Sequence, residues 1–69
     1  MTTQETALRT KTPYFIEYVW PKDSYGRQSF YYQLVRTKDL LIVYANPSLD
    51  KVLVGCWRND IPQSDVTIW

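Results

Sequence analysis

The sequence predicts an all-β fold, a small antiparallel meander of four to five strands that forms an open sheet or a small SH3-like barrel. Short runs rich in β-branched and aromatic residues recur along residues 14–69, and turn-forming residues separate them. The first run, YFIEYVW, carries no apolar stripe at helical spacing. Short strands at such intervals are typical of small sheets and barrels.

Residues 1–12 are polar except for Ala7 and Leu8, and we expect them to form a disordered N-terminal tail. The alternative is a short helix, because Thr2 and Glu5 have the spacing of a capping box. A helix of this length is marginal in water unless it docks on something else. Residues 13–69 are then a single small β domain, since 69 residues leave no room for a second one.

Five runs are the predicted strands, the last of them a possible one: residues 14–20, 29–37, 40–45, 51–57 and 65–69. Pro21, Asp23, Ser24 and Gly26 mark the first turn, Lys38-Asp39 the second, Asn46-Pro47 the third, and residues 58–64 form a loop. Gly55 lies within the fourth run, where a glycine indicates a bulge, a bend that closes a barrel or the close approach of another backbone; a bend is the preferred interpretation.

The segment SFYYQLV (residues 29–35) is apolar or aromatic at both even and odd positions, so both faces of the sheet need a cover. The even positions form the cleaner apolar set and are the first choice for the core. Register stays open between two turns: a two-residue loop pairs Val35 with Ile42, and a three-residue loop pairs Leu34 with Ile42.

Charge and composition exclude several classes of protein. Eight basic residues balance seven acidic ones, which argues against a strong electrostatic grip on nucleic acid or on an acidic membrane. No apolar run approaches a membrane span and no signal-peptide core is present, so we expect a soluble, cytoplasmic protein. One cysteine excludes an internal disulfide, and the absence of histidine argues against a zinc site.

The residues for catalysis are also missing, and we expect neither an enzyme nor a cofactor. Without histidine the commonest general base is absent. Cys56 is interpreted as a small buried hydrophobic residue. Glu17 interrupts an apolar strand, and we expect it to face solvent at an edge or to meet Arg36 or Arg58 across strands.

The second apolar face predicts a protein-interaction module or accessory subunit that self-associates, since exposed apolar patches usually mark interfaces. The predicted interface residues are Tyr31, Val35, Val43, Leu53 and Trp57, and the partner is a second copy of the chain or another protein. The alternative is a small β-barrel that binds single-stranded nucleic acid by base stacking. Its predicted contact residues are Arg27, Arg36, Arg58, Tyr31 and Trp57.

Overall fold

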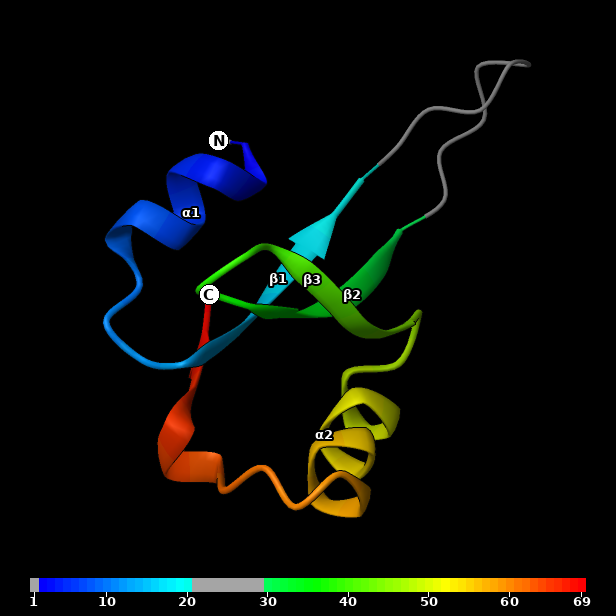
Figure 1. The fold of residues 1–69 in the computed structure, drawn as a ribbon. Helices are drawn as coiled ribbons and strands as arrows, with labels where there is room; N and C mark the ends of the chain where they lie inside the picture. Colours follow the sequence, from blue (N-terminus) through cyan, green and yellow to red (C-terminus); the bar gives the residue numbers. More distant parts are fainter. Residues whose placement is uncertain (1, 21–29) are drawn as a thin grey trace, which may run out of the picture.

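The computed structural model describes residues 2–20 and 30–69, which form an open four-stranded sheet with a helix on each face (Figure 1). The elements in chain order are α1 (Thr3–Arg9), β1 (Tyr14–Val19), β2 (Tyr31–Arg36), β3 (Leu41–Asn46), α2 (Leu49–Arg58), the 3-10 turn η1 (Gln63–Asp65) and β4 (Val66–Ile68). The strand order is β3-β2-β1-β4. The first three strands form the predicted antiparallel meander, but β4 pairs in parallel with β1, so the sheet is mixed.

The predicted fourth strand, residues 51–57, is wrong: this segment belongs to helix α2. Leu49, Val52, Leu53 and Cys56 recur at helical spacing and lie in or against the core. Burial of this stripe outweighs the strand preference of the valines in the segment. Gly55 therefore lies inside a helix and is not the bend expected from the sequence.

Helix α2 ends in a Schellman motif whose pivot is an aspartate. The amide of Ile61 donates to the carbonyl of Cys56 at 2.9 Å, and the amide of Asp60 donates to Trp57 at 3.2 Å. Asp60 has a φ of 57°, a left-handed conformation that glycine usually occupies at this position. The motif directs Ile61 back into the core beside Cys56, which ends the helix and starts the path toward β4.

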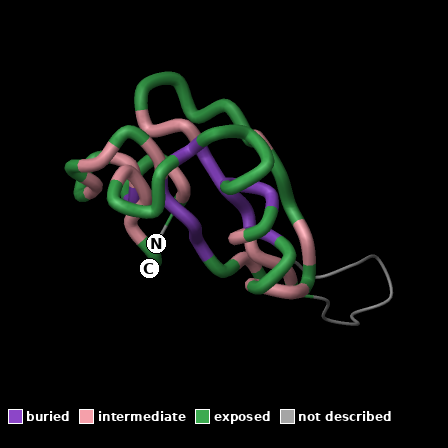
Figure 2. The backbone as a smooth tube through the Cα atoms, turned by 90° about the horizontal axis from the view of Figure 1, so that it is seen from below, coloured by how far each residue is buried: buried purple, intermediate pink, exposed green. Residues whose placement is uncertain are grey.

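The main core lies between α2 and one face of the sheet, called here the α2 face. Ile16, Leu34 and Val52 are completely buried at its centre. The β1–β2 register pairs Ile16 with Leu34, so the even positions of both strands point to this face, as expected. Figure 2 colours each residue by its burial, and many of the buried residues lie in the central strands β1 and β2. Each such side chain contributes about 1.5–3 kcal/mol to folding.

The opposite face, called the α1 face, is partly covered by the chain's own N-terminal segment. Residues 3–9 form helix α1 where we expected a disordered tail, and Thr2 caps it by accepting the amide of Glu5 at 3.1 Å. The hydroxyl of Thr3 donates to Glu17 Oε1, and Gln33 Nε2 donates to the same oxygen. Glu17 and Gln33 are buried on this face beside the completely buried Phe15 and Val35. Docking on these groups is what a helix of seven residues needs to persist.

The β2–β3 hairpin combines a four-residue turn with a bulge. Arg36 pairs with Leu41 and Val35 with Ile42, which is the pairing expected for the two-residue loop. The register then shifts by one residue, so that Leu34 pairs with Tyr44 and Val43 is the extra residue. The shift lets Val43 pack against the main core while Ile42 stays 54% exposed on the α1 face.

The sheet does not close into a barrel among the described residues, because β3 and β4 are its two edges. Strand β4 pairs within the chain: Phe15 lies opposite Thr67, and the amide of Trp69 donates to the carbonyl of Ile16 at 3.0 Å. The indole N–H of Trp69 also donates to Thr10 Oγ1 at 2.9 Å. The C-terminal strand thus holds the segment that follows α1.

Candidate functional site

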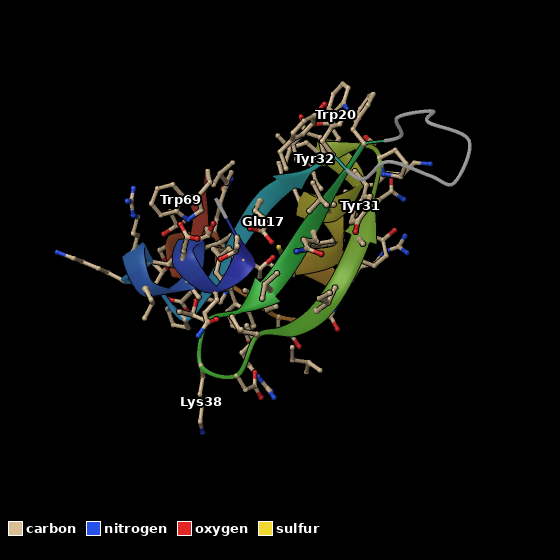
Figure 3. All side chains as sticks on the ribbon, turned by 90° about the horizontal axis from the view of Figure 1, so that it is seen from above. Glu17, Trp20, Tyr31, Tyr32, Lys38 and Trp69 are labelled. Atoms are coloured by element: carbon tan, nitrogen blue, oxygen red, sulfur yellow. The ribbon has the colours of Figure 1, made fainter. Side chains whose placement is uncertain are left out.

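Four aromatic side chains form an exposed aromatic cluster at one end of the β1–β2 pair: Tyr18, Trp20, Phe30 and Tyr32. The ring centroid of Tyr18 lies 5.6 Å from Trp20, 5.6 Å from Phe30 and 5.2 Å from Tyr32. Trp20 and Phe30 stack on each other at 5.6 Å with an interplanar angle of 18°. These separations are those of favourable aromatic pairs. Figure 3 shows Trp20 and Tyr32 together at this end of the sheet and Lys38 at the other.

The cluster continues the row of core residues on the α2 face. Ile16 pairs with Leu34 and Tyr18 with Tyr32, and Trp20 stacked on Phe30 comes next in the same alternation. Helix α2 packs mainly against β2 and β3, and it has few contacts with β1. The outer end of the row is left partly uncovered: Tyr18 is 43% exposed, Trp20 49% and Phe30 45%.

The base of the aromatic cluster is fixed to the core, and desolvation favours the neutral form of Tyr18. Tyr32 packs against the main core, so the stack has a rigid support. Desolvation raises the pKa of Tyr18 above its ordinary value, and repulsion from Tyr32 adds to the shift. The phenol of Tyr18 is neutral wherever an ordinary tyrosine is neutral, and the patch can meet an apolar surface without burying a charge.

The five interface residues predicted from the sequence do not share one surface. Tyr31 is half-buried on the α1 face, and Val35 is completely buried there. Val43 and Leu53 are half-buried against the main core on the α2 face. Trp57 lies on α2 and is 77% exposed.

The residues predicted for nucleic-acid binding are also dispersed. Arg27 lies outside the described residues. Arg36 and Tyr31 occupy opposite ends of β2 and, five positions apart, opposite faces of the sheet. Arg36 is paired with the carboxylate of Asp39. Arg58 lies in the last turn of α2 beside Trp57.

The groups considered for catalysis have other partners. Cys56 is only 4% exposed, and desolvation raises the pKa of its thiol. Glu17 lies under α1, held by Thr3 and Gln33, and not at a sheet edge or against an arginine. Within residues 2–20 and 30–69, no three side chains of the types His, Cys, Asp and Glu come together as a possible metal site. No helix in the same ranges is long and apolar enough to cross a bilayer.

All four members of the aromatic cluster occupy even positions, so the sequence predicts that they lie in the core. The even positions correctly identify the face of the sheet, but they do not show which part of that face is buried. The missing information was that residues 49–58 form a helix, and that this helix packs mainly against β2 and β3.

Comparison with protein-family models, with curated proteins and with solved structures gave no significant match.

Proposed function

We propose that this protein is a small protein-interaction module that associates with a second copy of itself through the aromatic cluster. The observation that supports this is the stack of rings in which three members are 43–49% exposed. Exposed tryptophan and tyrosine side chains are the residue types that contribute most at protein interfaces. The patch is also preorganised, because its rings contact one another and Tyr32 joins them to the core.

The size of the patch agrees with the centre of an interface. A fully buried aromatic side chain removes about 150–250 Å² from water, so three half-exposed rings present roughly 300 Å². Patches of about this size are often functional on monomeric proteins. A two-fold contact would cover the patch on both copies, roughly 600 Å² of the ~1,200–2,000 Å² in a stable interface. Residues around the cluster would supply the remaining area.

Self-association is preferred over single-stranded nucleic acid because the arginines that the structure describes do not accompany the rings. Stacking of bases on exposed aromatics is usually combined with a basic groove along the backbone. In the described part of the chain, Arg36 and Arg58 lie away from the cluster's ring contacts, and Arg36 is already paired. A cytoplasmic location, as expected from the sequence, belongs to the same proposal and is tested by cell fractionation.

The test is size-exclusion chromatography with multi-angle light scattering from low micromolar to millimolar protein. We expect a dimer that Trp20→Ala or Phe30→Ala dissociates at least tenfold more readily, since central aromatic residues contribute about 2 kcal/mol or more. Trp57→Ala is the matched control, because it removes an exposed tryptophan on α2 outside the cluster.

Two outcomes would count against the proposal. If Trp57→Ala loses the dimer and Trp20→Ala retains it, the interface lies on α2 and not on the aromatic cluster. A monomer at every concentration, combined with salt-sensitive quenching of tryptophan fluorescence by a mixed-sequence oligonucleotide, would favour nucleic acid instead.

A further inference from the structure

A hollow of about 350 Å³ lies between β3 and α2, and it shares no residue with the aromatic cluster. Its lining residues are Tyr44, Lys51, Val54, Gly55, Arg58 and Asn59. Residues 51, 54, 55 and 58 have the spacing i, i+3, i+4 and i+7, so one face of α2 forms the helical wall. The volume is in the range of small-molecule sites.

The charged groups of this hollow are all positive. Lys51 and Arg58 line it together, and no carboxylate among the described residues does. They stand seven residues apart on α2, about 10 Å along the axis, and both have side chains long enough to reach a ligand between them. Neither forms an ion pair with any other described residue. An anion would therefore be attracted without displacing an existing partner within the described chain, and the guanidinium fork of Arg58 suits a phosphate or carboxylate.

Gly55 and Tyr44 form the floor and the aromatic wall. A Cβ at position 55 would lie only 3.1 Å from Cδ1 of Tyr44, so the glycine lets the ring lie directly on the helix. A glycine inside a helix costs about 1 kcal/mol relative to alanine. The close approach of Tyr44 explains why position 55 is nevertheless a glycine. Tyr44 keeps 37% of its surface exposed, and its hydroxyl accepts from Asn46 Nδ2 at 3.3 Å.

Asn59 supplies a polar group at the C-terminal end of the helical wall. Its Nδ2 donates to the carbonyl of Gly55 at 2.7 Å, which orients the side-chain amide. The carbonyl oxygen of that amide is an acceptor that a ligand hydroxyl or amino group can use. The hollow thus combines two cations, a flat apolar surface and an oriented amide.

We propose that this hollow binds a small planar organic anion of the nucleoside monophosphate type. Its anionic group contacts Lys51 and Arg58, and its ring lies against Tyr44. Both parts of the ligand are needed for binding: the two cations select for charge, and the exposed side of Tyr44 selects for a flat ring.

The test is a titration of the ¹⁵N-labelled chain with AMP, followed by two-dimensional NMR. The Gly55 amide is a convenient reporter because the chain has only two glycines. We expect saturable shifts at Gly55, Arg58 and Asn59, and binding of adenosine or inorganic phosphate at least about tenfold weaker than that of AMP. Lys51→Gln and Arg58→Gln should each weaken AMP binding about tenfold or more, the loss typical of a hydrogen bond to a charged group.

Lys38→Gln is the matched control, because it removes one exposed positive charge at the β2–β3 turn, away from the hollow. Circular dichroism of each variant verifies that the fold is retained. The proposal is overturned if millimolar AMP causes no saturable shift at Gly55, or if Lys38→Gln weakens binding as much as Arg58→Gln. It is also overturned if phosphate or adenosine binds as tightly as AMP.

Discussion

Replacing Thr3 by valine removes the hydroxyl that links α1 to the sheet while it keeps the size of the side chain. In the native fold this hydroxyl donates to Glu17 Oε1 and receives a longer contact from Gln33 Nε2 at 3.4 Å. Glu17 is only 7% exposed, so water cannot easily replace the lost donor. Removing one partner of a buried polar group costs about 1–3 kcal/mol.

This loss corresponds to a decrease in melting temperature of roughly 4–8 °C for each kcal/mol in a chain of this size. Thermal unfolding measured by circular dichroism gives the global effect. Hydrogen exchange gives the local one, and we expect the amides of α1 to exchange faster. Leu8→Ala is the control on the same helix, because Leu8 is 81% exposed and its removal should change stability by less than about 0.5 kcal/mol.

If Thr3→Val leaves both the melting temperature and the α1 amide protection equal to those of the Leu8→Ala control, the docking described for α1 is refuted. Faster exchange confined to α1 with an unchanged melting temperature would contradict a different part of the reasoning. It would mean that α1 opens independently and adds nothing to the stability of the sheet.

Three further predictions concern acid stability, thiol reactivity and the C-terminus. The hydrogen bond from Arg36 lowers the pKa of Asp39 from 3.8 to about 2. The contribution of Asp39 to the free energy of unfolding is therefore complete above pH 3.8 and is lost as the pH falls through about 2. In urea unfolding measured at several pH values, Asp39→Asn should reduce the loss of stability in this acidic range, and an unchanged pH dependence would refute the prediction. Burial and a raised pKa should make Cys56 react with a thiol reagent far more slowly in the native protein than in urea, and equal rates would contradict its placement. Trp69→Phe removes the hydrogen bond to Thr10, and chemical unfolding should show a loss of about 0.5–1.5 kcal/mol; no loss would mean that the C-terminus is not held there.

The antiparallel strands were predictable because their signal is local. The runs around β1, β2 and β3 combine β-branched and aromatic residues with clear turn residues between them. The pairing of Val35 with Ile42 was one of two registers that the turn allows, and the sequence could not choose between them. The bulge at Val43 depends on what packs beneath the strand, which no local pattern shows.

Helix α2 was missed because a short apolar run is ambiguous. Val52 and Val54 favour a strand, and within residues 51–57 the apolar positions satisfy both periods. Leu49 would have started the helical stripe, but the Asn-Pro pair before it directed residues 46–50 to a turn. Helix α1 was only the alternative to a disordered tail, since its stability depends on Glu17 and Gln33, which lie far along the chain.

The errors in the predicted fold explain why the predicted candidate site differs from the observed one. The second apolar face was identified correctly from SFYYQLV, but part of it is covered by α1 and contains the buried Glu17 and Gln33. The exposed rings lie on the α2 face, where Tyr18, Trp20 and Phe30 keep close to half of their surface exposed. Parity along a strand tells which face a residue occupies, whereas exposure depends on where the covering element packs against that face.

The most direct measurement is an isotope-filtered NOE experiment on an equal mixture of labelled and unlabelled protein, recorded at a concentration where light scattering gives a dimer. The account predicts intermolecular NOEs from the rings of Trp20, Phe30 and Tyr18. Intermolecular NOEs confined to Trp57, or a protein that stays monomeric at millimolar concentration, would contradict it.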